Sequence, residues 1–229
     1  MSNAFNSVRR DHFLRQVREQ AQPLFHILWQ AYSEPTPLFY GTAVITSATG
    51  IQQGDPCGPA VFALAVDQVI RAVTAPFNCW YLDDGAIGGR VSTICSDLKH
   101  LIPAMGSAGL TINSNKCEII LPADITSEQM TNSVQSLYQL IPGAAVTGES
   151  EQTILGAPIS KAAAEAVIAE KQGELTHMIE RLRHLDVHPS LFFLRNCLWL
   201  PKLQHLLTRA PLGSAEQRVP LGGRGILAP

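Results

Sequence analysis

The chain has 229 residues, of which 46% are hydrophobic and 16% charged, and its formal net charge is −2. This composition predicts a folded domain with a sizeable core, excludes a disordered chain, and gives no sign of the basic surface expected for nucleic acid. The five cysteines form no CxxC pair, which favours free thiols in an intracellular protein. No apolar run reaches the ~20 residues of a membrane span, so we expect no membrane partner.

The first part of the chain predicts helices, then a hairpin and a loop. A polar, helix-forming stretch covers residues 6–21, and Pro23 opens a second helical stretch over residues 23–32. The arginines of the first stretch are assigned to a solvated helix face, with contact to a phosphate backbone as the alternative: Arg9, Arg10, Arg15 and Arg18. Residues 38–49 alternate and are rich in β-branched and aromatic side chains, which predicts a strand pair. A loop with three glycines follows at residues 50–59, and residues 61–73 predict a buried helix.

The middle of the chain continues in the same interleaved way. Residues 78–82 and 85–89 predict two strands of a hairpin with Asp83 and Asp84 at its turn. An amphipathic helix begins at Val91, and residues 111–121 contain two short β segments. Interleaved helices and hairpins of this kind predict an α+β fold, with one small antiparallel sheet and helices packed on one face.

The last part of the chain predicts one strand and then a helical region. The strand covers residues 153–159, and helix follows to about Arg209 with a break at Pro189. The tail from Pro211 contains the glycine-rich sequence LGGRG, which predicts disorder.

Asp83 and Asp84 are the first candidates for chemistry. Two adjacent carboxylates at a hairpin tip repel each other, and a divalent cation relieves that repulsion. A tight turn can bring both side chains to one side, and Mg²⁺ is commonly held by one or two carboxylates plus substrate phosphates. The alternative interpretation is an ordinary exposed Asp-Asp-Gly turn, since short motifs are weak signals.

The glycine-rich loop at residues 50–59 is the second candidate. Its glycines allow the backbone to approach a ligand closely, and Gln53 offers both a donor and an acceptor to a nucleotide or template base. The alternative is a purely structural loop that precedes a buried helix. Asp55 is assigned a structural role at the start of that helix.

Taken in order, four segments resemble motifs B, C, D and E of the reverse transcriptase palm: QQGDPCGP, YLDDGAIGG, GLTINSNKCEIIL and ILGAPIS. The first residues, MSNAFNSV, resemble the C-terminal part of motif A. The amino-acid sequences of these motifs, NAFNS and QQGDP above all, are most similar to those of the non-LTR (LINE-type) retrotransposon enzymes. The resemblance implies a palm over residues 1–160, a helical thumb-like segment over residues 161–210 and a disordered tail over residues 211–229.

The resemblance also implies an activity and its partners. It implies an RNA-directed DNA polymerase, a nucleotidyltransferase acting on an RNA template, a DNA primer and deoxynucleoside triphosphates. Two Mg²⁺ or Mn²⁺ ions serve this reaction in the family. Asp83 and Asp84 match two of the three metal-binding carboxylates. We expect them at one end of the sheet, beside the start of the chain and the strand that carries Phe5.

Five further residues receive roles through the resemblance. Phe5 matches the aromatic residue that excludes a ribose 2′-hydroxyl, although it is equally consistent with a core residue. Gln53, Gly54 and Tyr81 match positions around the incoming nucleotide. Lys116 matches a motif D lysine that protonates the pyrophosphate leaving group, with a solvated turn lysine as the alternative.

One departure from the family pattern concerns the start of the chain. The motif A aspartate would stand one residue before Met1, and the basic fingers region would precede it. We therefore expect a truncated domain that binds metal weakly and is inactive as an isolated chain. The alternative is a non-catalytic, degenerate retrotransposon remnant with weak nucleic-acid binding.

Overall fold

The computed structural model describes residues 1–121 and 127–198. The chain divides into two compact units, Met1–Val146 and Thr147–Pro229, and each is described by itself. None of the helices in the described part of the chain is long and apolar enough to cross a membrane.

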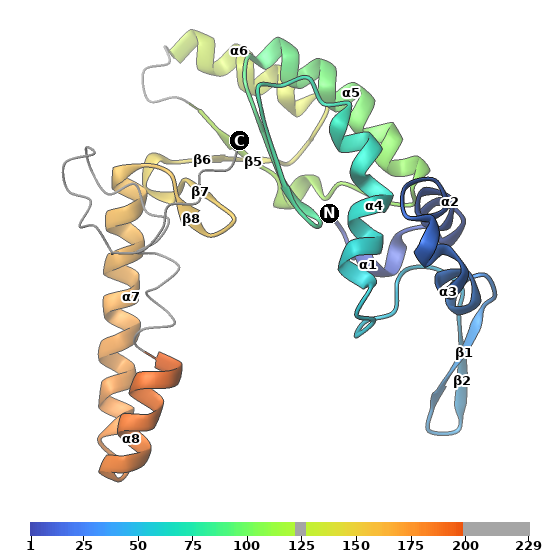
Figure 1. The fold of residues 1–229 in the computed structure, drawn as a ribbon. Coiled ribbons are helices and arrows are strands. Elements are labelled where there is room, and N and C mark those ends of the chain that lie inside the picture. The colour runs from blue at the N-terminus through green and yellow to red at the C-terminus, as the bar shows by residue number, and fades with distance from the viewer. Residues whose placement is uncertain (122–126, 199–229) are drawn as a thin grey trace, which may run out of the picture. The chain divides into compact units, whose positions relative to one another are not determined.

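The first unit is built mainly from helices (Figure 1). They are α1 (Ala4–Ser7), α2 (Arg10–Gln20), α3 (Gln22–Tyr32), α4 (Gly58–Arg71), α5 (Val91–Ser107) and α6 (Ser127–Tyr138), with a 3₁₀ turn, η1, at Ser114–Lys116. The helices predicted over residues 6–32, 61–73 and from Val91 are confirmed, with shifted ends. The predicted α+β character is confirmed as well, since these helices alternate with short strands.

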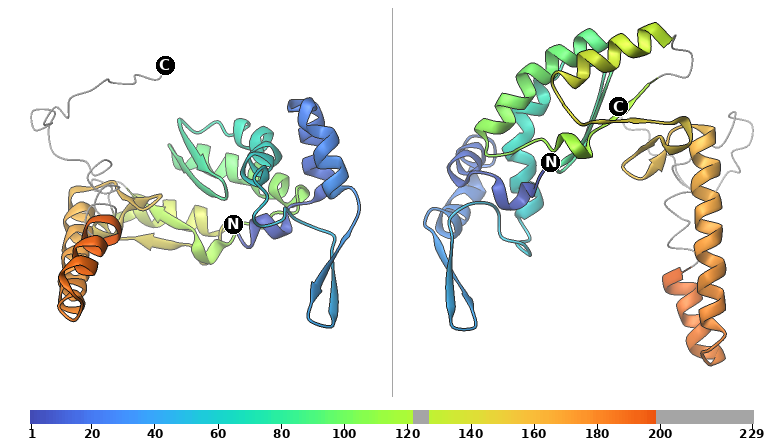
Figure 2. Two further views of the ribbon diagram at one scale, coloured as in Figure 1. Left: turned by 60° about the horizontal axis from the view of Figure 1, so that its bottom comes forward. Right: turned by 180° about the vertical axis from the view of Figure 1, so that it is seen from behind.

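The strands pair as two-stranded sheets. In the first unit β1 (Thr36–Tyr40) pairs antiparallel with β2 (Ala43–Ser47), and β3 (Phe77–Tyr81) with β4 (Asp84–Gly88). β5 (Glu118–Ile120) pairs with β6 (Ala145–Thr147), and in the second unit β7 (Thr153–Ile154) pairs antiparallel with β8 (Ala157–Pro158). The β1–β2 hairpin extends away from α2 and α3 in every view (Figure 1; Figure 2).

The prediction of one small sheet with helices on one face was wrong for the described residues. Four separate two-stranded sheets take its place. The residues within the strands give a physical reason why the hairpins do not join into one sheet. Proline cannot donate a hydrogen bond to a neighbouring strand, and glycine offers no side chain for a sheet face. Pro37 lies inside β1, and Gly85 and Gly88 lie inside β4.

The core of the first unit forms where α2 packs on α3 and α4, and α4 packs on α5. Phe13 and Val17 of α2, Phe62 of α4 and Met105 of α5 are completely buried. On each of these helices the buried apolar residues recur three or four positions apart, so they lie on one face. The helices bury those faces against one another.

The first nine residues run between two other segments of the first unit. On one side Phe5 and Val8 accept hydrogen bonds from the backbone N–H groups of Ile51 (2.7 Å) and Gly50 (2.9 Å). On the other side the N–H groups of Ser2 and Arg9 donate to Thr111 (3.0 Å) and Ala108 (2.9 Å). The start of the chain is therefore a structural element of the core rather than a loose end.

Phe5 was expected on a strand, and this was wrong. It lies in the single helical turn of α1, which begins after Asn3 in a left-handed conformation with φ 46°. The Ile51 N–H donates to the Phe5 carbonyl within this turn, and the Gly50 N–H donates to Val8 just after it. The turn is therefore held by tertiary contacts rather than by helix propensity.

In the second unit, the predicted strand at residues 153–159 is a short hairpin, and the helical region consists of α7 (Lys161–Leu182), α8 (Val187–Phe193) and a π-helical turn at Leu194–Leu198. The predicted break at Pro189 was wrong. The chain turns at residues 183–186, and Pro189 lies in the first turn of α8, where proline is tolerated. The predicted disordered tail and the end of the thumb-like segment lie outside the described residues.

Gly50 tests how closely the chain start and the loop approach. A Cβ at Gly50 would lie 2.5 Å from the Asn6 backbone, and its φ is +73°. We expect Gly50→Ala to lower the free energy of unfolding by about 2–3 kcal/mol, as measured by urea denaturation. Gly106→Ala is the matched control, because Gly106 is helical with open space around it. That variant should be neutral or stabilising, and equal effects of the two would contradict the close approach.

Candidate active site

The β3–β4 hairpin presents the two candidate carboxylates. Tyr81 pairs with Asp84, so the two-residue turn consists of Leu82 and Asp83. The turn had been predicted one residue later, at Asp83 and Asp84; instead Asp84 begins β4. Leu82 has a φ of 55°, which a branched side chain adopts only when its surroundings require it, and its side chain packs at the edge of the core.

The body of the hairpin is held by Trp80. Its ring covers Gly85 on the paired strand so closely that a Cβ there would lie 2.3 Å from the indole. The indole N–H donates to the Asn78 side chain (2.7 Å), whose amide donates to the Ile70 carbonyl of α4 (2.9 Å). A residue with a side chain at position 85 would push Trp80 away and loosen the hairpin from α4.

Asp97 binds the residues that precede the hairpin, Thr74 and Ala75. It is buried on α5, where its carboxylate accepts hydrogen bonds from the N–H and hydroxyl of Thr74 (3.1 and 2.8 Å) and from the N–H of Ala75 (2.8 Å). Burial by itself would raise the pKa of Asp97, but these bonds outweigh it and hold the pKa below its ordinary value. The turn before β3 is thereby fixed to α5.

The tip of the hairpin lies beside the start of the chain, as predicted (Figure 1). The N-terminal ammonium of Met1 approaches the Asp83 carbonyl at 3.5 Å, and the next residue, Ser2, is bonded to Thr111. The Asp83 side chain is partly buried and that of Asp84 is exposed.

Lys116 lies at the end of η1, with an exposed side chain. Burial raises the pKa of the neighbouring Cys117 thiol, although the charge of the N-terminal ammonium acts on it in the opposite direction. The chain start therefore brings the hairpin tip and the segment that carries Lys116 into one region.

Gln53 and Gly54 are exposed on the loop before α4. The loop is fixed to the chain start, because the N–H groups of Ile51 and Gly50 donate to Phe5 of α1 and to Val8 just after it. Phe5 is half-buried on α1, and its ring stacks on Phe62 with centroids 4.7 Å apart. This contact accounts for Phe5 as a packing residue, and its role toward the ribose stays a prediction.

Two buried residues beneath this loop, Arg10 of α2 and Tyr32 of α3, were not predicted from the sequence. Arg10 had been assigned to a solvated helix face, and this was wrong: it is 7% exposed. Its spacing from Phe13, Leu14 and Val17 places it on the apolar face of α2, a signal that could have revealed its burial. Tyr32, only 1% exposed, lies beside it, with the Arg10 guanidinium 5.3 Å above its ring.

The carboxylate oxygens of Asp83 and Asp84 fit a hard divalent cation, but they are only part of a ligand shell. Among the described residues no group of three or more His, Cys, Asp or Glu could hold a metal ion. Two adjacent carboxylates are expected to bind Mg²⁺ weakly, because that ion keeps its waters unless several ligands converge.

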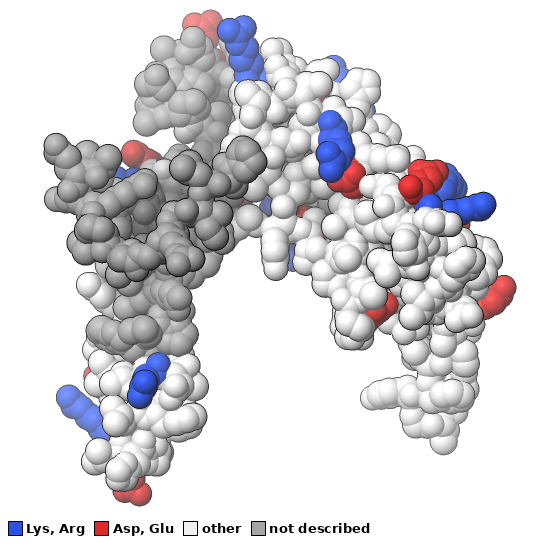
Figure 3. Space-filling view, in the orientation of Figure 1, with Lys and Arg blue, Asp and Glu red and all other residues white. Residues whose placement is uncertain are grey.

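Charged side chains are scattered over the face drawn in Figure 3, with broad uncharged areas between them. This distribution agrees with the formal net charge of −2. Nucleic-acid contact on this face would depend on individual positions rather than on a basic patch.

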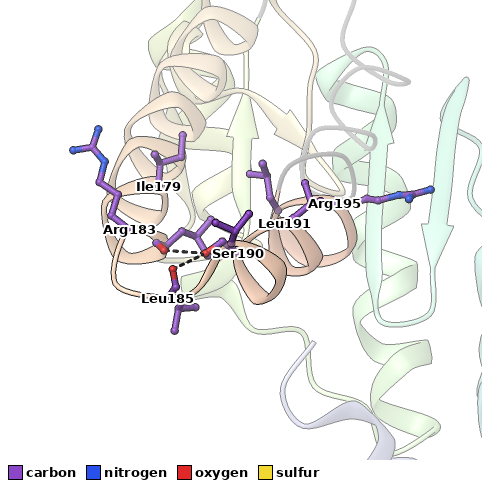
Figure 4. Close-up of a pocket in the computed structure, with 9 residues that line it drawn as sticks. Ile179, Arg183, Leu185, Ser190, Leu191 and Arg195 are labelled. Carbon is purple, nitrogen blue, oxygen red and sulfur yellow. Dashed lines mark hydrogen bonds between the residues drawn. The ribbon is translucent and has the colours of Figure 1, made fainter.

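A separate apolar hollow lies between α7 and α8 in the second unit (Figure 4). Ile179, Leu185 and Leu191 line it, and Arg183 and Arg195 lie at its margin. The Ser190 hydroxyl donates to the Leu182 carbonyl (3.0 Å), which ties α8 back to the end of α7. None of the candidate residues lines this hollow.

Comparison with known families gives one match. The family described as reverse transcriptase (RNA-dependent DNA polymerase) matches residues 1–159. The chain belongs to the reverse transcriptase family. No curated protein and no solved structure matched it.

The reverse transcriptase match includes every candidate residue: Phe5, Gln53, Gly54, Tyr81, Asp83, Asp84 and Lys116. The structure gathers Asp83 and the Lys116 segment around the chain start, and it attaches the Gln53 loop to the next few residues of the same segment. The individual roles of these residues and the boundary after residue 160 stay predictions.

Asp97 offers a test of how the hairpin is anchored. Asparagine keeps only one of the two acceptor oxygens. Its amide N–H₂ group would face a backbone N–H group, which would then lack an acceptor. We therefore expect Asp97→Asn to cost about 2–3 kcal/mol near neutral pH, measured by urea denaturation. The depressed pKa means that this stability is present above the ordinary value of 3.8 and is lost as the pH falls through the lower folded value.

The difference between wild type and Asp97→Asn should therefore shrink in acid. Asp67→Asn is the control, because Asp67 pairs with exposed Arg71 and such pairs contribute little. A difference that stays constant down to the most acidic pH tested would contradict the anchoring role of the carboxylate.

Tyr32 offers a second test. Burial and the hydrogen bond to Asp55 raise the pKa of Tyr32 from 10.0 to about 12. The ultraviolet difference titration between wild type and Tyr32→Phe should show one phenol that ionises near that value. The stability that Tyr32 contributes should be present below pH 10 and be lost as the pH rises toward 12. Ionisation of this phenol near pH 10 would contradict its buried, bonded state.

Proposed function

We propose that the domain is the palm of an RNA-directed DNA polymerase of the non-LTR retrotransposon kind. The observation that carries the proposal is the tip of the β3–β4 hairpin, where Asp83 and Asp84 lie against the chain start that resembles motif A. The family match supports reverse transcription as the reaction. The motif wording NAFNS and QQGDP supports the retrotransposon subtype.

Asp83 and Asp84 are the proposed ligands of Mg²⁺ or Mn²⁺. A divalent ion bound there would stabilise negative charge on the phosphate that is transferred. The hairpin supplies the rigidity that such ligands need, since Trp80 and Asp97 fix its two strands and its approach. Carboxylates on a fixed turn lose little freedom when they bind a cation.

Gln53, Gly54, Phe5 and Tyr81 are the proposed nucleotide-contacting residues. Gln53 is exposed and carries one donor group and one acceptor, which suits a base or sugar edge. Tyr81 is 66% exposed next to the hairpin turn and can stack on a base or ribose. Phe5 is held by Phe62, so its ring would present a fixed steric barrier.

Lys116 is the proposed proton donor to the pyrophosphate leaving group. Its exposed ammonium stands at the end of η1, and the N-terminal charge acts on the thiol of the next residue, Cys117. A positive charge there would also favour a triphosphate over an uncharged ligand.

Metal binding tests the proposed ligands directly. We expect the chain to bind Mn²⁺ with a dissociation constant of roughly millimolar order, measured by electron paramagnetic resonance of free Mn²⁺. Asp83→Asn and Asp84→Asn should each abolish that binding, while Asp67→Asn should leave it unchanged. Binding that survives in the double variant Asp83→Asn and Asp84→Asn would place the cation elsewhere.

Primer extension tests the reaction. The described residues supply two carboxylates at the tip, so we expect no measurable extension on an RNA template by residues 1–229 alone. A longer protein with a related enzyme's fingers region and motif A aspartate ahead of Met1 should extend a primer, because the triphosphate is then positioned. Asp83→Ala should abolish that synthesis. Robust extension by the short chain, lost in Asp84→Ala, would contradict the ligand count.

A further inference from the structure

The loop that carries Gln53 and Gly54 is flexible by composition but held by two buried side chains. Gly50 and Gly54 both have positive φ, at +73° and +92°, and glycine loses more conformational freedom on ordering than any other residue. Arg10 of α2 binds the segment that leads into this loop, and Tyr32 of α3 binds the residues on either side of Gln53 and Gly54. We propose that they are positioning residues, which hold Gln53 and Gly54 in the conformation that meets an incoming nucleotide. This inference rests on the proposed function.

Arg10 holds the start of the loop and the residues just before it. Its guanidinium donates to the carbonyl groups of Gly50 (3.1 Å), Ser47 (2.9 Å) and Thr49 (3.4 Å), and to the Ser47 hydroxyl (2.9 Å). A fifth bond reaches the Glu34 carbonyl (3.4 Å), and none of the five goes to a carboxylate. Only the planar fork of arginine can bridge so many acceptors from one position.

Tyr32 holds the middle of the loop. Its hydroxyl accepts a hydrogen bond from the Gln52 N–H (3.2 Å) and donates to the Asp55 carboxylate (2.5 Å). The other oxygen of Asp55 accepts from the Cys57 N–H (2.8 Å), just before α4 begins. One buried hydroxyl therefore fixes the residues on both sides of Gln53 and Gly54.

The residues between these two anchors form a tight turn. The Asp55 N–H donates to the Gln52 carbonyl (3.2 Å), so Gln53 and Gly54 are the two central residues of a four-residue turn. A positive φ at the third position is what a type II turn requires, and Gly54 supplies it. The space around a Cβ at Gly54 is open, so the turn projects outward from a fixed base.

The two side chains also hold each other. The Arg10 guanidinium lies over the Tyr32 ring, and Phe13 meets the same ring edge to face at 5.2 Å. Arg10 and Tyr32 together form a clamp on the loop, and this clamp is part of the core of α2 and α3. The conformational entropy of the turn is therefore already lost during folding. Nucleotide binding then carries a smaller ordering cost.

Tyr32→Phe is the sharpest variant, because the ring and its contacts stay while the hydroxyl is removed. Backbone amide hydrogen exchange should accelerate at least about tenfold at Gln52 and Cys57, with exchange in α2 and α5 unchanged. Tyr40→Phe is the matched control, since Tyr40 is 80% exposed on β1. Unchanged exchange in the loop, or equal acceleration throughout the core, would overturn the clamp.

Binding of a fluorescent deoxynucleoside triphosphate in the presence of Mn²⁺ completes the test. Tyr32→Phe, Arg10→Lys and Gln53→Ala should each weaken binding by about tenfold, the worth of one good hydrogen bond. The double variant Tyr32→Phe and Gln53→Ala should be no weaker than the weaker single variant, because the clamp acts through the turn. Tyr40→Phe should bind like wild type.

The outcomes separate the two proposals. If Gln53→Ala weakens binding and Tyr32→Phe does not, the positioning role is wrong while the proposed function stands. If neither Gln53→Ala nor the clamp variants change the affinity of a wild-type chain that binds, the nucleotide site lies elsewhere and both proposals fail. A wild-type chain that binds no nucleotide would also overturn both.

Discussion

The first nine residues of the chain are the constraint on which the rest of the first unit depends. Their backbone groups bond to residues 50 and 51 on one side and to residues 108 and 111 on the other, and Met1 approaches Asp83 at the hairpin tip. Buried backbone groups need hydrogen-bond partners, and the first nine residues share theirs with the segments on both sides. The loop, the hairpin tip and the Lys116 segment therefore take their relative places from one stretch of extended chain and a single helical turn.

Two buried charged residues serve the same end in different ways. Arg10 and Asp97 each use a charged group to bind several backbone groups at once, Arg10 through carbonyls and Asp97 through N–H groups. A buried charge is costly unless it is fully hydrogen-bonded, so residues of this kind tolerate little substitution. Each fixes a segment that precedes a candidate site, the glycine-rich loop in one case and the β3–β4 hairpin in the other.

This arrangement suits chemistry in which positioning matters more than reactive side chains. Phosphoryl transfer relies on placed cations and placed reactants, and small displacements lower its rate strongly. The family match gives that chemistry its context, and the local geometry shows fixed supports beneath exposed groups. Gln53, Gly54 and Tyr81 are exposed, while Tyr32, Trp80 and Asp97, which hold their segments, are buried or half-buried.

The sequence by itself determined what local patterns encode. Residue spacing gave the helices, the two hairpins around residues 40 and 83 and the carboxylate pair, and the ordered motifs gave the family, which the comparison confirmed. Tertiary structure alone decided that the strands form separate hairpins, that Phe5 lies in a helical turn and that the turn at residues 82–83 precedes Asp84. It also decided which carbonyl groups Arg10 binds. The turn that carries Phe5 and the bonds of Arg10 depend on residues far along the chain, Ile51 and Gly50 among them, and no local periodicity can record such pairings.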